Sequence, residues 1–334
     1  MRRILVTGSA GFIGSHLCDA LLAKGDEVIG LDNFASGVRE NLTSALAHPR
    51  FKLVEGSILD AELLARLCQG VDVVFHMAVE CVRLSIGRPL PNHAVNATGT
   101  LLTLEAARRC GVPKFIYCSS SEVNGNGRDR ILSEETTIPE PVTVYGGAKL
   151  AGEHYTKAYY RTYGMHTTIV RPFNTYGPRE HYEGVLAEVI PKFIIRALNG
   201  KPPLIYGDGS NARDFTYVTD TVRGIIAASE ADALIGRVVN IAYGKAVSVA
   251  EIASAILKAV GRDDIIPDYI DPRPGDVLHL QADIQIATEL LNYQAEIDLE
   301  TGLNQTVEWF RTAFPDPSVL LAHDLERAWA EVEA

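Results

Sequence analysis

The sequence predicts an α/β protein whose main domain is a doubly wound parallel sheet, accompanied by a smaller α/β lobe. Three observations lead to this fold class. Short runs of β-branched and aromatic residues alternate with longer helical patterns. The short runs are continuously apolar, which is typical of parallel strands covered by helices on both faces. A glycine-rich segment follows the first run directly and precedes a helical pattern.

Six strands are expected in the first half of the chain. They cover residues 4–7, 27–31, 51–54, 71–75, 114–118 and 166–170. Helical patterns lie between them, the longest at 12–24, 92–109 and 145–163. Right-handed crossovers then place helices on both faces of the sheet. Ligands of such sheets bind beyond the carboxyl ends of the strands.

The composition of the sequence changes after Arg171, where Gly, Pro, Asn and Asp become frequent. This composition predicts a smaller, loop-rich lobe. We expect residues 1–170 to form the sheet domain, with a return segment near 214–242. Residues 171–213 and 243–330 are expected to form the second lobe, whose loops would carry recognition.

Composition excludes several classes of protein. The formal net charge of −11 disfavours nucleic acid and anionic membranes as partners. Five cysteines form no CxxC pair, so neither a disulfide framework nor a zinc site is indicated, and no metal is expected. The apolar run 4–6 is too short for a signal peptide, and none reaches the ~18 residues of a membrane span. We therefore expect a reducing cytoplasm.

Three glycines separate the first strand from the first helix, in the segment Gly8-Ser9-Ala10-Gly11-Phe12-Ile13-Gly14. Gly8 permits a tight turn, Gly11 allows the backbone to approach a pyrophosphate, and Gly14 lets helix and strand pack closely. The free N–H groups of the helix N-terminus then face the phosphates. The position of this turn indicates a Rossmann-type dinucleotide site, although three glycines alone are a weak signal.

Asp32 ends the second expected strand. A carboxylate there can accept hydrogen bonds from both hydroxyls of an adenosine ribose and would repel a 2′-phosphate. No Arg or Lys follows until Arg39. NAD is therefore favoured over NADP. The alternative is a loop aspartate that forms a turn with Asn33.

Tyr145 and Lys149 are four residues apart, so one face of a helix presents both. A tyrosine titrates near ~10, and a nearby ammonium favours its phenolate. Such a tyrosine could take a proton from a sugar hydroxyl. Hydroxyls of the cluster 119–121 lie at the end of the fifth expected strand, next to Glu122. The pair also occurs by chance, and serines in such turns are often only capping groups.

Together, the glycine turn, the serine cluster, Tyr145-xxx-Lys149 and the segment Arg171-Pro172-Phe173-Asn174-Thr175-Tyr176-Gly177-Pro178-Arg179 resemble the extended short-chain dehydrogenase/reductase family. Within it they resemble the NAD-dependent nucleotide-sugar epimerases, dehydratases and decarboxylases. The resemblance extends to about Phe310. It implies a catalytic Ser120, Tyr145 as acid and base, and Lys149 as its activator and a ribose ligand.

The resemblance also implies the binding residues. Besides the residues above, it assigns to the cofactor Phe12, Ile13, Asn33, Ser57, Ile58, Met77, Ala78, Asn96 and Pro172. It assigns to a nucleotide sugar, usually of UDP, Arg83, Asn174, Leu204, Tyr206, Arg213, Arg273 and Asp276. The planar guanidinium of arginine suits this role because it binds phosphate oxygens bidentately.

Three positions depart from the family pattern. Ser57 stands where Asp often contacts adenine, which loosens adenine binding. Met77-Ala78-Val79 replaces a run of alanines. Asn124 replaces a usual tyrosine, with no consequence that the sequence explains.

The resemblance leaves several reactions open. Family members oxidise C4 of the sugar, and then epimerise, dehydrate across C5 and C6, or decarboxylate. Dehydratases usually pair Asp with Glu where this chain has Ser121 and Glu122, and decarboxylases carry an arginine that is absent between Arg273 and Asp283. The segment 81–86 is more similar to epimerases. We therefore rank a 4-epimerase first, a dehydratase or decarboxylase second, and a non-catalytic NAD-binding regulator last.

The helical patterns at 92–109 and 145–163 also bear on assembly. In the family, the two corresponding helices pair across a two-fold axis as a four-helix bundle. The resemblance therefore implies a homodimer, although the sequence alone permits both faces to be core.

Overall fold

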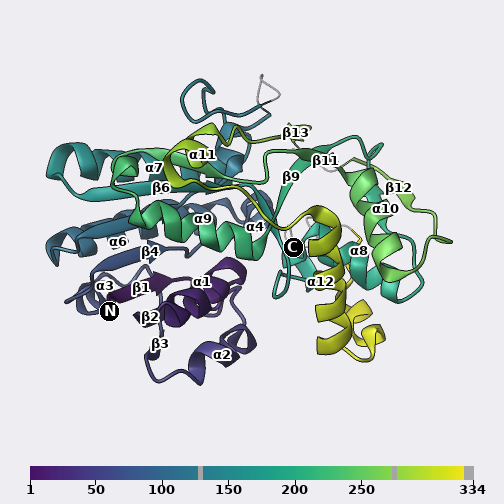
Figure 1. Ribbon diagram of the computed structural model, residues 1–334, viewed down its shortest axis with the longest axis horizontal. Coiled ribbons are helices and arrows are strands. Elements are labelled where there is room, and N and C mark those ends of the chain that lie inside the picture. Colours follow the sequence, from purple (N-terminus) through teal and green to yellow (C-terminus); the bar gives the residue numbers. More distant parts are fainter. Residues whose placement is uncertain (127–130, 273–276, 327–334) are drawn as a thin grey trace.

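A seven-stranded parallel sheet forms the centre of the computed structural model, which describes residues 1–126, 131–272 and 277–326 (Figure 1). The strand order is β10-β6-β5-β4-β1-β2-β3, and all neighbours are parallel. The strands are β1 (Arg3–Thr7), β2 (Glu27–Asp32), β3 (Phe51–Glu55), β4 (Val73–His76), β5 (Lys114–Cys118), β6 (His166–Pro172) and β10 (Val238–Ile241). The predicted fold class is confirmed. All six expected strands form, and β10 adds a seventh.

Helices cover both faces of the sheet, because successive side chains of a strand point to opposite sides. Ile4 and Val6 pack on one face and Leu5 on the other, all without exposed surface. The first face carries α1 (Phe12–Ala23), α9 (Val218–Glu230) and α11 (Gln285–Leu291). The second carries α3 (Ala61–Leu67), α6 (Thr100–Arg109) and α7 (Val144–Tyr163).

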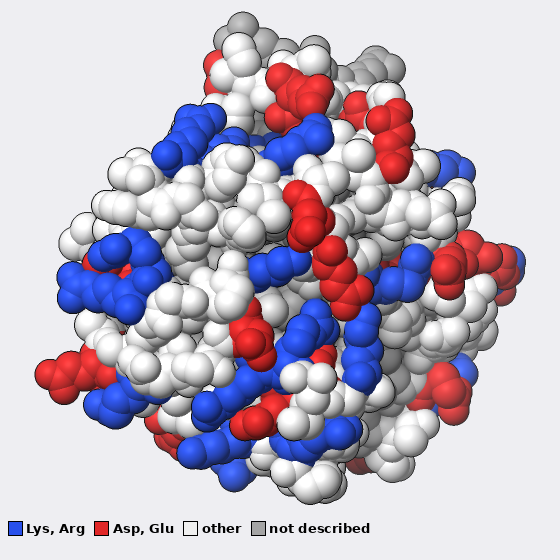
Figure 2. All heavy atoms as spheres, turned by 60° about the vertical axis from the view of Figure 1, so that its left-hand side comes forward, with Lys and Arg blue, Asp and Glu red and all other residues white. Residues whose placement is uncertain are grey.

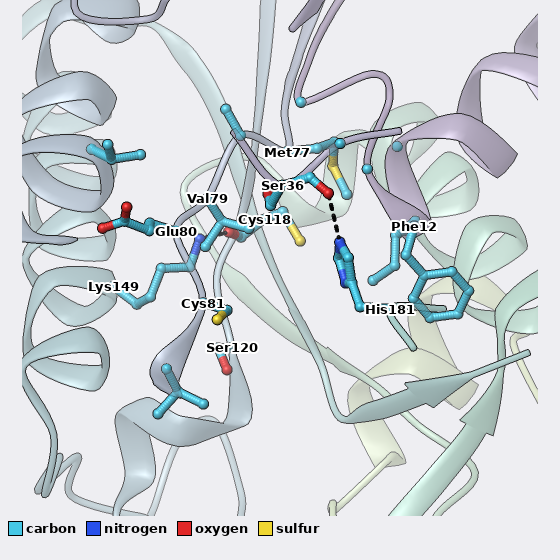
Figure 3. Close-up of a pocket in the computed structure, with 18 of the residues that line it drawn as sticks. Phe12, Ser36, Met77, Val79, Glu80, Cys81, Cys118, Ser120, Lys149 and His181 are labelled. Atoms are coloured by element: carbon cyan, nitrogen blue, oxygen red, sulfur yellow. Dashed lines mark hydrogen bonds between the residues drawn. The ribbon is translucent and has the colours of Figure 1, made fainter. Parts of the chain in front are cut away.

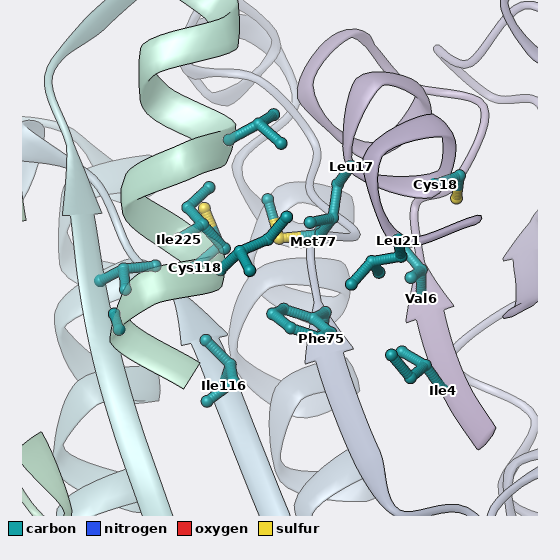
Figure 4. Close-up of a cluster of buried hydrophobic side chains, with 14 of the residues drawn as sticks. Ile4, Val6, Leu17, Cys18, Leu21, Phe75, Met77, Ile116, Cys118 and Ile225 are labelled. Atoms are coloured by element: carbon teal, nitrogen blue, oxygen red, sulfur yellow. The ribbon is translucent and has the colours of Figure 1, made fainter. Parts of the chain in front are cut away.

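The core on the α1 side is drawn in Figure 4. Leu17 and Leu21 of α1 and Ile225 of α9 meet Phe75 and Ile116 of the sheet there. Complete burial of an aliphatic or aromatic side chain of this size contributes about 1.5–3 kcal/mol to folding. These contacts therefore hold α1 and α9 against this face of the sheet.

The second lobe contains two small sheets and three long helices. β9 (Ala212–Tyr217) lies between β11 (Ala246–Ser248) and β13 (His279–Leu280) and also pairs with β7 (Asn174–Tyr176), whereas β8 (Leu204–Tyr206) pairs with β12 (Asp268–Ile270). The helices are α8 (Val189–Leu198), α10 (Val249–Val260) and α12 (Leu299–Ala313). Their apolar sides share a core with Phe215 and Tyr217 of β9.

The helix expected over 92–109 is interrupted. The structure has α5 (Pro89–His93), a π-helical stretch (Ala94–Gly99) and then α6. Wider π-helical turns often mark functional positions. Here the side-chain amides of Asn92 and Asn96 donate hydrogen bonds to the carbonyl of Glu80 in a neighbouring loop. The periodicity of apolar residues cannot reveal such a contact. Two further short helices are α2 (Thr43–Leu46) and α4 (Val82–Gly87).

Charges of both signs are interspersed over the face of the molecule that Figure 2 shows. No helix within the described ranges is both long and apolar enough to pass through a membrane.

Candidate active site

The glycine turn between β1 and α1 is held in the conformation that its sequence permits. Gly8 has a φ of +69°, and a Cβ there would lie 2.7 Å from the backbone of Ala78. A Cβ on Gly14 would collide with the carbonyl oxygen of Gly8. Gly11 precedes α1 without a side-chain cap, so the first N–H groups of the helix keep their capacity to bind an anion.

Asp32 lies beside this turn, at the end of β2. Its carboxylate accepts hydrogen bonds from the backbone N–H groups of Ala10 (2.8 Å) and Phe34 (2.8 Å). Burial raises the pKa of Asp32, and these hydrogen bonds oppose that shift. Each carboxylate oxygen has a second lone pair, so the side chain can still accept from a ligand hydroxyl.

The glycine turn, Asp32 and the expected catalytic residues line one cavity of about 320 Å³. It lies beyond the carboxyl ends of β1, β2, β4, β5 and β6, as expected for this fold class. The predicted residues that line it are Gly8, Gly11, Phe12, Ile13, Gly14, Asp32, Asn33, Ser57, Ile58, Met77, Ala78, Ser120, Ser121, Glu122, Tyr145, Lys149, Pro172 and Asn174.

Lys149 lines the cavity from helix α7. The helix begins after Thr143, whose side chain accepts a hydrogen bond from the Gly146 N–H (3.0 Å). Lys149 is 3% exposed and donates from Nζ to the carbonyl of Cys118 (2.6 Å). Its ammonium also lies 4.9 Å from the centre of the Tyr117 ring. Figure 3 shows Lys149 near the turn that carries Ser120.

Tyr145 lies one helical turn before Lys149. Burial raises the pKa of Tyr145, and its hydrogen bond with Ser120 opposes that shift. The sequence suggested that a nearby ammonium would favour the phenolate. In the structure, desolvation by burial has the larger effect on the pKa of Tyr145. A further positive charge in the cavity would lower the pKa of Tyr145.

The serine turn follows β5 directly. Ser120 precedes the 3₁₀ turn Ser121–Asn124, and its Oγ accepts a hydrogen bond from the Glu122 N–H (3.2 Å). Ser120 therefore caps the turn and lines the cavity at the same time. A Cβ on Gly146 would approach the Glu122 carbonyl oxygen to 2.8 Å, so a glycine allows α7 to lie close to this turn.

Asn96 contacts a loop of the cavity wall instead of lining the cavity. Its Oδ1 accepts from the Glu80 N–H (3.0 Å), and its Nδ2 donates to the Glu80 carbonyl (2.9 Å). Asn92 donates to the carbonyls of Glu80 (3.1 Å) and Cys81 (3.0 Å). The two asparagines thus hold the loop that follows Ala78.

The expected substrate residues are divided among several places. Asn174 lines the cavity, and its buried Oδ1 accepts no hydrogen bond from a described residue. Arg83 is buried outside the lining, where it pairs with Glu188 (2.8 Å) and donates to the Val185 carbonyl (2.8 Å). Leu204 and Tyr206 on β8 and Arg213 on β9 belong to the second lobe and also lie outside the lining. Arg273 and Asp276 lie outside the described residues.

The sequence interpretation missed several lining residues. Glu80 and Cys81 directly follow the predicted pair Met77 and Ala78, so a longer segment would have included them. His181 lies between Phe12 and Ser36 in Figure 3, and its Nε2 contacts the Ser36 carbonyl (3.2 Å). This contact joins segments 145 residues apart in the chain, and no local pattern signals it.

The fold and the cavity define a Rossmann-type member of the extended short-chain dehydrogenase/reductase group. A glycine turn, a carboxylate after the second strand and a Tyr–Lys pair meet in one cavity. The sequence profile of the NAD dependent epimerase/dehydratase family matches residues 4–242, and the chain belongs to that family.

Similar proteins include both epimerases and a dehydratase. A UDP-glucose 4-epimerase of Mycolicibacterium smegmatis is 38% identical over 92% of this chain and 98% of its own. The structure of a UDP-glucose 4-epimerase from Thermotoga maritima with UDP-glucose has a TM-score of 0.88, at 36% identity and 93% and 99% coverage. A dTDP-glucose 4,6-dehydratase from Streptomyces venezuelae with NAD bound has a TM-score of 0.89, at 34% identity and 95% and 99% coverage.

Proposed function

We propose that the protein is an NAD-dependent nucleotide-sugar 4-epimerase, with a UDP-hexose, UDP-N-acetylhexosamine or UDP-hexuronate as its substrate. The observation that carries the proposal is the shared cavity, which brings Tyr145, Lys149 and Ser120 together with the glycine turn and Asp32. Similarity to two UDP-glucose 4-epimerases over more than nine-tenths of the chain supports it.

The residues at the glycine end of the cavity fit NAD. Gly8 and Gly14 let the turn pack closely against Ala78 and against its own backbone, and the start of α1 offers N–H groups to a pyrophosphate. Asp32 suits the two hydroxyls of an adenosine ribose and would repel a 2′-phosphate. Bound NAD supplies a reversible acceptor for the hydride that leaves C4 of the sugar.

The chain's own residues manage the proton of the reaction. Tyr145 takes the proton of the C4 hydroxyl as the C4 carbon is oxidised, and gives it back when the carbon is reduced on the opposite face. Ser120 hydrogen-bonds the reacting oxygen. Lys149 contributes a positive charge one helical turn from the phenol, and the positive nicotinamide ring of oxidised NAD, when bound, would favour the phenolate of Tyr145. The net change is inversion at C4 with no change in mass.

The residue beside Glu122 supports epimerisation over dehydration. Removal of water across C5 and C6 takes an acid and a base. Dehydratases usually have an Asp–Glu pair for this step, and the present chain has the hydroxyl of Ser121 in place of the aspartate. Glu122 nevertheless lines the cavity, and a dehydratase is among the similar structures. A dehydratase or a decarboxylase is therefore the second candidate. A regulator without turnover would not require Tyr145 and Lys149.

Product mass separates these candidates directly. The protein and NAD would be incubated with UDP-glucose, UDP-N-acetylglucosamine and UDP-glucuronate, and the products analysed by liquid chromatography with mass detection. An epimerase gives a new peak of unchanged mass. A product lighter by water identifies a dehydratase, and one lighter by carbon dioxide a decarboxylase. No product from any sugar would remove the proposed function.

We further propose a homodimer formed through α6 and α7, as the family resemblance implies. Exposed apolar side chains on α4 to α7 support it, among them Ile86 (39% exposed), Leu90 (80%), Leu101 (37%) and Tyr163 (55%). Burial of such residues favours association. Size-exclusion chromatography with light scattering should give twice the mass of the chain, and a monomer at micromolar concentration would contradict this.

We also propose that the protein resides in a reducing cytoplasm and acts in carbohydrate metabolism. All five cysteines are free thiols in the structure. Alkylation of protein taken directly from cells, followed by mass measurement, should find five modified thiols. Oxidised pairs would argue against this compartment.

A further inference from the structure

We propose that Glu153 is a positioning residue of the active site, whose buried carboxylate holds the three chain segments that carry Lys149, Ser120 and Pro172. The proposal rests on the function proposed above, because it assigns Glu153 a role in that reaction. Glu153 is not among the described residues that line the cavity, so it acts through its neighbours.

Glu153 continues the column of catalytic side chains along α7. Tyr145, Lys149 and Glu153 follow one another at intervals of four residues, so all three lie on the helix face that meets the sheet. Lys149 is 3% exposed and Glu153 is 1% exposed. A carboxylate at this depth is costly unless it is paired and hydrogen-bonded.

Three hydrogen bonds satisfy this carboxylate. Arg171 on β6 donates from Nε to Oε1 (2.7 Å) and from Nη2 to Oε2 (2.7 Å), which is the two-pronged geometry of a guanidinium on a carboxylate. Ser119 donates from Oγ to Oε1 (2.6 Å). The side chain of Arg171 is 3% exposed, so the pair is shielded from water and salt.

Each partner of Glu153 directly precedes a residue of the cavity. Ser119 is followed by Ser120, and its N–H extends the β5–β6 pairing to the carbonyl of Val170 (2.8 Å). Arg171 is followed by Pro172. The carboxylate of Glu153 therefore fixes the relative positions of β5, β6 and α7 beside the cavity.

The energetics favour a role in placement over a role in stability. A buried ion pair is often no more stabilising than a well-packed apolar pair of similar volume. Elsewhere on the same face of the sheet, α7 packs through apolar contacts, such as Tyr159 in a cluster with Ile169. The hydrophobic effect is non-directional, whereas hydrogen bonds weaken steeply away from their preferred angles, so three short bonds to one carboxylate define the position of α7 more narrowly.

The charge of Glu153 also bears on Lys149. Burial lowers the pKa of Lys149, and the nearby carboxylate of Glu153 opposes this shift. The other ionisable group that acts on Lys149 is the thiol of Cys118 on β5, and Lys149 in turn lowers the pKa of the buried His76 on β4. Glu153 thus helps Lys149 to keep its ammonium form.

The test separates placement from stability by replacing the whole pair. In Glu153→Gln, Arg171 keeps a buried charge without its partner, and both the melting temperature and kcat with UDP-glucose should fall. In the double variant E153L/R171M, an apolar pair replaces the ion pair, and the melting temperature should return to within a few degrees of the wild type. Asp324→Asn is the matched control, because it breaks the Arg196–Asp324 pair (2.6 Å) of the second lobe.

The proposal predicts that activity does not return together with stability. In E153L/R171M, kcat should stay about 10- to 100-fold below the wild type, the size of effect that displaced catalytic groups produce, while KM for UDP-glucose changes less than about three-fold. Asp324→Asn should lower the melting temperature and leave kcat unchanged. Recovery of kcat in parallel with the melting temperature would overturn the proposal.

Two further readouts cover the case in which the double variant does not fold. Glu153→Asp retains the charge but withdraws the carboxylate by one methylene, so it should lower kcat while the melting temperature changes little. NAD affinity, measured by calorimetry without substrate, should weaken in the same variants because Lys149 is displaced. An inactive wild type would remove the proposed function but leave the calorimetric test in place. Wild-type NAD affinity and kcat in Glu153→Asp would overturn the positioning role.

Discussion

The two ends of the cavity are built on different principles. At the glycine end, the turn after β1 and Asp32 after β2 come from one continuous stretch of about thirty residues, and most of its ligand-binding capacity belongs to the backbone. At the catalytic end, Ser120 follows β5 whereas Tyr145 and Lys149 lie on α7, and their side chains provide the chemistry. The first end depends on shape and available space, whereas the second depends on titratable groups and on the contacts that place them.

The largest effect is expected at the catalytic end. Tyr145→Phe keeps the shape of the ring and removes only the proton-transferring hydroxyl. We expect kcat with UDP-glucose to fall by about 10²- to 10⁴-fold, while NAD affinity by calorimetry stays within a few-fold. Wild-type turnover in this variant would exclude Tyr145 from the mechanism.

A charge change at the glycine end should alter cofactor choice. Asp32→Asn removes the carboxylate that would accept from the ribose hydroxyls. A hydrogen bond to a charged group contributes about 1.5–3 kcal/mol, so NAD affinity should fall about 10- to 100-fold. NADP affinity should fall less, because the repulsion of its 2′-phosphate disappears as well. An unchanged NAD/NADP ratio in calorimetry would show that Asp32 does not bind the ribose.

A volume change at the same end should act through shape. In Gly14→Ala, the added Cβ collides with the carbonyl oxygen of Gly8. We expect NAD affinity to fall about ten-fold and stability to fall by about 1–3 kcal/mol. Gly147→Ala on α7 is the matched control, because a Cβ there meets no atom within 4 Å, and it should stabilise the helix by about 0.5–1 kcal/mol. Equal behaviour of the two variants would contradict the crowding argument.

The smallest effect concerns stability near the glycine end. Burial lowers the pKa of His76 from 6.5 to about 3. The unfolded chain takes up this proton below pH 6.5 and the native protein does not, so the stabilising contribution is complete above pH 6.5 and is lost as the pH falls toward 3. Between pH 6.5 and 5 it amounts to about 2 kcal/mol. His76→Asn should show a flatter decline of melting temperature over this interval, and parallel curves would refute the assignment.

The same contrast explains how far the sequence could predict the structure. The glycine turn and Asp32, which the sequence assigns to a cofactor site, line the cavity together because spacing within one β–α–β segment determines their place. Ser120 and Asn174 line the cavity because they closely follow β5 and β6, whereas Tyr145 and Lys149 reach it from the first turns of α7. The strand pattern predicted six of the seven strands of the sheet, all except β10.

Contacts between distant segments could not be predicted in this way. The sequence does not show that the side-chain amide of Asn96 hydrogen-bonds the backbone of Glu80. Nor does it show that Arg83 pairs with Glu188 or that His181 contacts Ser36. It also does not show how far burial raises the pKa of Tyr145, because the degree of burial is a property of the assembled cavity.

The most direct test of the central claim follows the hydrogen on C4 of the sugar. The protein with NAD would be supplied with UDP-glucose carrying deuterium at C4, and the product isolated and examined by mass and proton spectra. Transient oxidation and return of the same hydrogen predicts a C4 epimer that retains its deuterium, with Tyr145→Phe giving no product. A C4 epimer that has exchanged its deuterium for solvent hydrogen would contradict the account, because inversion would then proceed through proton abstraction at C4 without NAD.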